Sequence, residues 1–293
     1  MGRGAAIWLA LLIATPLLTA AQTGATNALV VTLEPEQVFN GSPCVFRVAS
    51  QIGITSISGT WMGRRLVFGF DAKTRAWYSV GGIGAEIGAA KYPLVIMAAL
   101  ASGENVTSTY SIPVAYMRPP LSYLSVDPEF LNSTPAIRAR IKLEQALKNR
   151  AFSSSSSAQM WEGAFAAPMQ AAISEVFGAR RIFNGRHRGL HQGLDYDVEM
   201  GTPVAAMNSG KVILARDLFF EGKLIVLDHG RGLLTLYLHL SDFRVKEGAS
   251  IKRGQIIGLS GKSGRTTGPH LHVAVRWQGV YVDPLRLFAL ASL

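Results

Sequence analysis

Apolar and polar residues alternate in short runs along the first third of the chain, and turn-forming Gly, Asn and Ser residues separate these runs. Alternation with a period of two is typical of strands that bury one face. The strands predicted in this way are Leu29–Leu33, Val45–Val48, Leu66–Phe70, Tyr92–Ala98 and Tyr110–Ala115. Several short strands with turn signals between them predict a small β-sandwich, immunoglobulin-like, over residues 26–116. We find no catalytic group of residues in this segment.

A different pattern follows, with helix signals between two β-rich segments. Thr134 can cap a helix whose first position is Pro135, and this helix is predicted to end near Phe152. Its basic residues are Arg138, Arg140, Lys142, Lys148 and Arg150. The run Ser153–Ser157 is expected to be a flexible hinge. Residues 117–159 are therefore predicted to be a linker that carries a basic helix.

The last part of the chain, residues 160–293, is again rich in strand formers and contains the histidines of the sequence. Three islands there have spacings that suit a metal site: His191-Gln-Gly-Leu-Asp195, Tyr237-Leu-His239-Leu-Ser241 and Gly268-Pro-His270-Leu-His272. A catalytic zinc ion takes three ligands from His, Asp, Glu or Cys and keeps one position open for water. The islands can supply such a set and leave histidines for proton transfer. Two other histidines are predicted to be an exposed loop residue, His187, and a hairpin-turn residue, His229.

The spacing within the islands restricts their geometry. His270 and His272 are two residues apart in a predicted strand, so their side chains point to the same face. One can bind the metal and the other can act as acid or base, and the spacing does not decide which. In a straight strand His191 and Asp195 would lie roughly 13 Å apart, too far to share one ion. We therefore expect a bend at Gly193, because glycine adopts conformations closed to other residues.

The islands also stand in order among further motifs. In chain order these are His191-Gln-Gly-Leu-Asp195, Gly201-Thr-Pro-Val-Ala205, Asp228-His-Gly230, Tyr237-Leu-His-Leu-Ser241, Lys252-Arg-Gly-Gln255 and Gly264-Arg-Thr-Thr-Gly-Pro-His-Leu-His272. From about Met160 to Phe288 the pattern resembles the lysostaphin-like (LytM-type) peptidoglycan zinc metalloendopeptidases. The resemblance implies a compact antiparallel β-domain of the duplicated hybrid motif type. It also implies that His191, Asp195 and His272 bind one Zn²⁺ per chain and that His239 and His270 are the paired catalytic histidines.

The resemblance implies a zinc-dependent endopeptidase that hydrolyses peptide cross-links of bacterial peptidoglycan. A zinc-bound water loses its proton near pH 7, and two neutral histidines suit proton transfer and oxyanion stabilisation. Asp197 is expected either to orient a ligand histidine or to be a solvated strand residue. One alternative is a non-catalytic wall-binding or amidase-activating module on the same fold. Another is a metallopeptidase that acts on proteins or peptides outside the wall.

The sequence leaves two aspects of this function open. It does not decide between a direct D,D cross-link and a glycine bridge as the bond cut. The position of the linker helix before the peptidase-like segment also suggests the hypothesis that the helix shields the groove.

The amino terminus predicts export. Arg3 precedes an apolar stretch, Ala5–Leu18, and small residues follow it, which is the pattern of a signal peptide over residues 1–21. Pro16 interrupts the stretch, which is shorter than the roughly 20 residues of a membrane span. We therefore expect cleavage after Ala20 or Ala21 and no stable membrane span in the mature protein. The expected location is the periplasm or cell envelope, with secretion as the alternative.

Charge and cysteine content narrow the set of partners. The net charge is +10, which favours encounter with polyanions by electrostatic steering. An exported chain without a concentrated run of Lys and Arg is a poor nucleic-acid binder, so we expect either an anionic wall or membrane surface as the partner or a mixed basic surface without a partner. Cys44 is the single cysteine, so it cannot form an internal disulfide. It alternates with Phe46 and Val48 and is predicted to be a buried, inert thiol.

Overall fold

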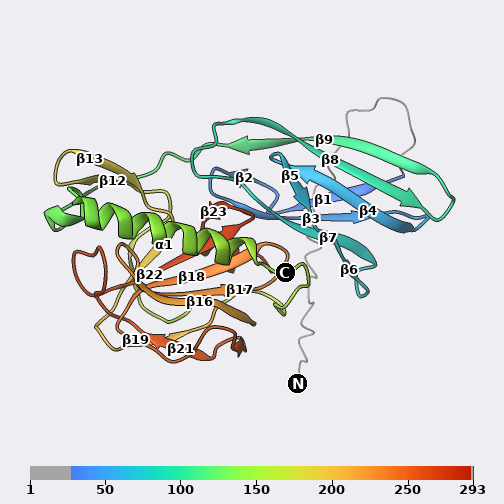
Figure 1. Ribbon diagram of the computed structural model, residues 1–293. Coiled ribbons are helices and arrows are strands. Elements are labelled where there is room, and N and C mark those ends of the chain that lie inside the picture. The colour runs from blue at the N-terminus through green and yellow to red at the C-terminus, as the bar shows by residue number, and fades with distance from the viewer. Residues whose placement is uncertain (1–27, 292) are drawn as a thin grey trace, which may run out of the picture.

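The computed structural model in Figure 1 describes residues 28–291 and 293. Strands predominate in it, as the sequence predicts, and a long helix, α1 (Pro135–Ser153), lies along one of two β-rich parts. The predicted signal peptide, residues 1–21, falls outside the described residues. Within the described part of the chain, no helix has both the length and the apolar character needed to cross a bilayer.

Two sheets form the first β-rich part, and their buried side chains belong to one core. The first sheet has the order β1 (Val30–Glu34), β3 (Pro43–Ala49), β7 (Ala76–Gly82), β6 (Gly69–Asp71). The second has the order β2 (Val38–Phe39), β9 (Asn105–Ala115), β8 (Ala90–Leu100), β4 (Ile54–Trp61), β5 (Arg64–Leu66). Phe46 of the first sheet contacts Trp61 of the second edge to face, with ring centroids 5.3 Å apart. Cys44 is buried, as predicted, and burial raises the pKa of its thiol.

One predicted strand is wrong. Leu66–Phe70 is not a single strand, because β5 ends at Leu66 and β6 begins at Gly69. β5 pairs with β4 and β6 pairs with β7, so the chain passes from one sheet to the other between them. Leu66 is buried whereas Phe70 is exposed, and the apolar pattern alone does not show the break between them.

The segment between the two β-rich parts is more ordered than its composition suggests. It contains β10 (Leu121–Leu124), the 3₁₀ turn η1 (Pro128–Phe130) and α1, which Thr134 caps by accepting a hydrogen bond from the backbone N–H of Ile137. The serine run, predicted to be a flexible hinge, is instead fixed to the buried carboxylate of Asp228. Ser155 Oγ and the Ser156 backbone N–H each donate to this carboxylate, at 2.7 Å.

An eight-stranded sheet dominates the second β-rich part. Its order is β11 (Ala172–Glu175), β14 (Leu194–Asp197), β22 (Leu271–Trp277), β18 (Leu233–Leu240), β17 (Gly222–Asp228), β16 (Gly210–Leu218), β20 (Ser250–Ile251), and β23 (Val280–Val282) pairs with β22. Two small sheets flank it, one of β10, β12 (Arg180–Phe183) and β13 (His187–Leu190), the other of β15 (Pro203–Ala205), β21 (Ile256–Leu259) and β19 (Asp242–Phe243). Helix α1 covers the large sheet with Leu147, Ala151 and Phe152.

The two β-rich parts share a continuous apolar core. A short helix, α2 (Pro284–Phe288), follows β23 and lies against the first part, where Arg286 Nη1 donates to Ser42 Oγ at 2.9 Å. At Gly82 a side chain would come within 2.9 Å of both Trp277 and Val282. The predicted division of the chain into domains stays a prediction, but the contacts show that the two parts are packed against each other.

Candidate functional site

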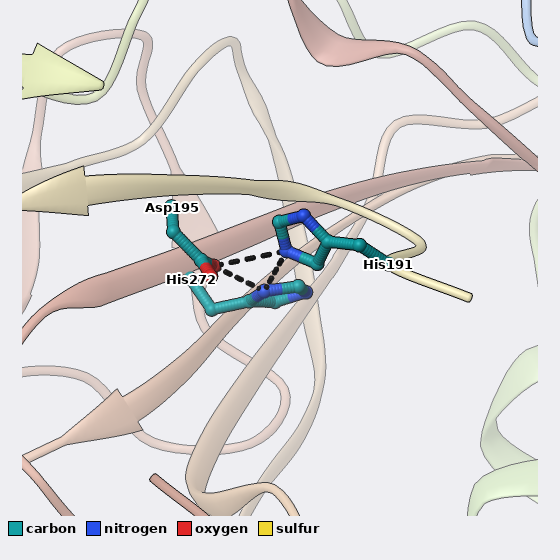
Figure 2. A group of neighbouring side chains, drawn as sticks. All are labelled: His191, Asp195 and His272. Atoms are coloured by element: carbon teal, nitrogen blue, oxygen red, sulfur yellow. Dashed lines mark hydrogen bonds and ion pairs between the residues drawn. The ribbon is translucent and has the colours of Figure 1, made fainter. Parts of the chain in front are cut away.

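Three polar side chains meet on one face of the large sheet, where β14 pairs with β22 (Figure 2). His191 Nε2 lies 3.1 Å from Asp195 Oδ1 and 3.0 Å from His272 Nδ1, and His272 Nδ1 lies 2.6 Å from Asp195 Oδ1. The three residues are buried, and each turns one metal-ligating atom toward a common point. Of the residues predicted from the sequence, these are the ones assigned to the metal.

Neighbouring strands place two of these residues side by side. Asp195 on β14 is the direct partner of His272 on β22, so their side chains lie on the same face of the sheet. His191 precedes β14, and the chain bends at Gly193 as predicted. The physical reason differs from the one predicted from the sequence. A Cβ atom at Gly193 would lie 2.6 Å from His272 Cε1 and closer still to the Val273 carbonyl, so close packing requires the glycine.

Groups outside this triangle hold its members in place. The His191 Nδ1–H donates to the carbonyl of Val176 at 2.8 Å, which leaves Nε2 with a free lone pair. Arg181 Nη2 donates to Asp195 Oδ2 at 2.6 Å, so Oδ1 is the carboxylate oxygen that faces the two imidazoles. The Arg181 Nε–H also donates to Glu175 Oε2 at 2.6 Å. The carboxylate of Asp195 is therefore held in one orientation.

Asp197, for which two roles were predicted, is exposed at the end of β14. In the described part of the chain, it makes no hydrogen bond to a ligand histidine. Its position fits the solvated strand residue, and the orienting contacts come from other residues.

The second pair of predicted residues lies beside the triangle. The rings of His239 and His270 have centroids 4.9 Å apart, and His270 Nε2 lies 4.0 Å from Asp195 Oδ1. Carbonyls at the two ends of one loop orient this pair. His239 Nδ1 donates to Ser263 O at 2.8 Å, and His270 Nδ1 donates to Gly268 O at 2.9 Å. Each Nε2 atom is then left as an acceptor.

His239 has an uncommon backbone conformation for a strand residue. Its φ is 61°, and the pairing of β18 with β17 shifts register here, with two residues of β18 facing one of β17. Such a bulge redirects a side chain next to a functional site. Burial, together with the nearby imidazoles of His272 and His270, lowers the pKa of His239 to about 3. The ring is therefore neutral at neutral pH.

The charges of the triangle reinforce one another. Burial would raise the pKa of Asp195, but the imidazoles of His272 and His191 hold it well below its usual range. Burial lowers the pKa of His272, although the Asp195 carboxylate opposes this shift. The site therefore presents one carboxylate and two imidazoles, which is a donor set for a borderline metal ion.

A groove of about 730 Å³ contains all five predicted residues. One side of it is formed by Lys148 and Phe152 of α1, and another by the strands β10 and β12. Lys148 forms an ion pair with Glu221, which fixes the helix at the edge of the groove. The helix therefore forms part of the groove wall, and the hypothesis that it shields the site stays a prediction.

The two remaining predicted histidines lie away from the triangle. His187 is exposed, as predicted, but it begins strand β13 instead of lying in a loop. His229 follows β17 in the turn to β18, as predicted, and its ring is buried. Its nitrogens contact Ser209 O at 2.7 Å and Thr235 Oγ1 at 2.8 Å. It is a structural residue.

Sequence reasoning missed three residues of the groove: Glu175, Arg181 and Arg265. No motif marks the first two, because their contacts with Asp195 and with each other depend on how β11, β12 and β14 meet. Arg265 lies within the motif Gly264–His272, three residues before the island that begins at Gly268, and this position was the available signal.

The fold and the site together define a β-rich peptidase domain whose polar centre has two imidazoles and one carboxylate. Residues 189–284 match peptidase family M23. The carboxy-terminal part of the chain is thus an M23 peptidase domain of the lysostaphin-like type, as the resemblance of its motifs implied.

Several known proteins are similar to this chain. The peptidoglycan DD-endopeptidase ShyA of Vibrio cholerae is 41% identical over 115 residues, which is 39% of this chain and 27% of ShyA. The DD-carboxypeptidase/endopeptidase Mpg of Neisseria meningitidis is 41% identical over 113 residues, 39% of this chain and 26% of Mpg. The chain thus spans about a quarter of the length of these curated relatives. A crystal structure of a putative M23 peptidase from Pseudomonas aeruginosa, 26% identical, superposes with a TM-score of 0.65 over 86% of this chain and 95% of that one.

Proposed function

We propose that this protein is an exported, zinc-dependent endopeptidase that hydrolyses peptide cross-links of bacterial peptidoglycan. The observation that carries the proposal is the position of His239 and His270 beside the triangle of His191, Asp195 and His272 in one groove. Two relatives whose names include peptidoglycan or DD-peptide cleavage support the substrate class. The periplasm or cell envelope is the corresponding location.

The donor atoms of the triangle fit a zinc ion. Zinc with ligand distances near 2.0–2.1 Å in a tetrahedral site places its ligand atoms roughly 3.3 Å apart. Two of the three separations, 3.1 and 3.0 Å, are close to this value, and the third, 2.6 Å between Asp195 and His272, is shorter. His191, Asp195 and His272 would therefore hold one ion. When bound, zinc polarises a peptide carbonyl and acidifies a water molecule.

The histidine pair supplies the proton chemistry. The Ser263 and Gly268 carbonyls keep the protons of His239 and His270 on Nδ1, so both Nε2 atoms can accept a hydrogen bond from water, and His270, the less buried of the two rings, accepts the proton. A histidine that has accepted this proton can return it to the leaving amine. The pair is the only part of the proposal that separates an enzyme from a binding module on the same fold, because the triangle alone would serve for binding.

Digestion of purified peptidoglycan tests the proposal. We expect the full chain loaded with zinc to release peptide-linked fragments that mass spectrometry identifies as the products of one amide bond. His270→Ala should bind zinc normally and reduce the rate by about 100-fold or more, since general acid–base catalysis contributes 10²–10⁴-fold. Unchanged hydrolysis in this variant would falsify the assigned site. Wall binding without hydrolysis in the wild type would favour the binding or amidase-activating module.

A further inference from the structure

Arg265 is a positively charged residue of the groove that has no part in the proposed chemistry. Its guanidinium carbon lies 4.9 Å from the ring centroid of Phe183 and 4.8 Å from that of Phe220. Its backbone N–H donates to Phe220 O at 2.9 Å, so the residue is fixed at the backbone as well. A guanidinium that lies over aromatic faces keeps its N–H donors free at its edge. The Arg265 side chain is therefore held in place by the two aromatic rings, and its N–H groups can still donate hydrogen bonds to a ligand.

The other lysine and arginine side chains of the groove are already paired. Lys148 forms an ion pair with Glu221, and Arg181 forms ion pairs with Glu175 and Asp195. Among the described residues, no carboxylate lies within ion-pair distance of the Arg265 guanidinium. The Glu221 carboxylate attracts the Arg265 guanidinium from beyond ion-pair distance, and the positive charge of Arg181 repels it. A half-buried cation in this state is complementary to an anionic group of a ligand.

The surrounding elements place Arg265 close to the reacting groups. It lies in the loop from Ser263 to Gly268, whose end carbonyls accept the Nδ1–H groups of the histidine pair. Its partner Phe183 is two residues from Arg181 on β12, and Arg181 contacts Asp195. Residues two apart on a strand share a face at a spacing of roughly 7 Å. The Arg265 guanidinium therefore lies in the same groove as the triangle of His191, Asp195 and His272, next to Arg181.

We infer that Arg265 binds a carboxylate on the substrate residue that supplies the amine of the cleaved amide bond. This inference rests on the proposed function and specifies its substrate. In a direct D,D cross-link whose amine comes from the side chain of a 2,6-diaminopimelate residue, the amine belongs to a carbon that also carries a free carboxylate, next to the bond that is cut. Within a glycine bridge no such carboxylate stands beside the internal amides. The geometry at Arg265 therefore selects direct cross-links over glycine bridges.

Two substrates that differ in one group test the inference. The first is a purified cross-linked muropeptide dimer with the free carboxylate beside the cross-link nitrogen, and the second is the same dimer with a carboxamide there. The zinc-loaded full chain is assayed with both, together with Arg265→Gln and Arg265→Lys. Arg253→Gln is the matched control, because Arg253 is exposed, lies outside the groove and carries the same charge.

We expect the wild type and Arg253→Gln to prefer the carboxylate by roughly 10- to 100-fold in kcat/KM, the range of one charge-assisted hydrogen-bonded contact. Arg265→Gln should bring this ratio close to one by raising KM for the carboxylate dimer alone. Arg265→Lys should give an intermediate ratio, since an ammonium keeps the charge and loses the planar fork.

Two results would overturn the inference while leaving the proposed function intact. One is equal cleavage of both dimers by the wild type. The other is an Arg265→Gln variant that slows both dimers by the same factor, which indicates a structural role for the side chain. If the wild type cleaves neither dimer, the proposed function itself fails and the inference fails with it.

Discussion

Replacement of Gly193 by alanine tests whether close packing sets the geometry of the triangle formed by His191, Asp195 and His272. The added Cβ atom would lie 2.6 Å from His272 Cε1, whereas carbon atoms in contact are normally about 3.5–4.0 Å apart. The Val273 carbonyl, closer still, belongs to the central strand β22 and has little room to move. We therefore expect the His272 ring to move by about 1 Å. A misplacement of this size costs on the order of 100-fold in rate.

Zinc affinity and folding stability are measured separately. Competition with a chromophoric chelator should show zinc binding weakened by about 10- to 100-fold, comparable to the loss of a supporting contact. The free energy of unfolding should fall by about 1–3 kcal/mol, the usual cost of an overpacked core. Gly88→Ala is the control, because a Cβ atom at Gly88 meets nothing within 4 Å. Unchanged zinc affinity in folded Gly193→Ala would refute the reasoning.

Two further predictions concern charged and titrating groups. Arg181→Gln should weaken zinc binding by about 10-fold, because Asp195 loses the contact that fixes its orientation. Arg180→Gln is the control: Arg180 is the exposed neighbouring residue, and its replacement should leave zinc affinity unchanged. Equal effects in a zinc competition assay would contradict this. Burial lowers the pKa of His229 to about 4 from 6.5, so the unfolded chain binds a proton more tightly and stability falls as pH drops from about 6.5 toward 4. The loss is about 3 kcal/mol at 1.36 kcal/mol per pKa unit, and urea unfolding of His229→Gln should show a correspondingly smaller change over that window.

The local geometry of the triangle of His191, Asp195 and His272 and of the histidine pair was largely predictable, because it follows from local rules. The bend at Gly193 follows from the short separation of His191 and Asp195, and the common face of His270 and His272 follows from strand periodicity. The start of α1 follows from Thr134 and Pro135. In each case the information lies within a few residues of the feature.

The features that escaped prediction depend on contacts between distant segments. Arg181 reaches Asp195 only because β12 lies next to the ion triangle, and no spacing within either segment encodes this. The serine run that contains Ser155 has the composition of a flexible hinge. The buried carboxylate of Asp228 nevertheless accepts a hydrogen bond from the Ser155 hydroxyl. The break after Leu66 depends on which sheet each half of the run joins.

The packing of Trp277 and Val282 against Gly82 affects any reuse of the peptidase in chimeric proteins. A fusion that carries only residues 189–284, the stretch that matches the family, would present these apolar side chains to solvent. Such a hybrid would aggregate before its peptidase activity could be measured. A chimeric protein should therefore carry both β-rich parts together. A fusion that carries the peptidase part alone needs polar side chains in place of the exposed Trp277 and Val282.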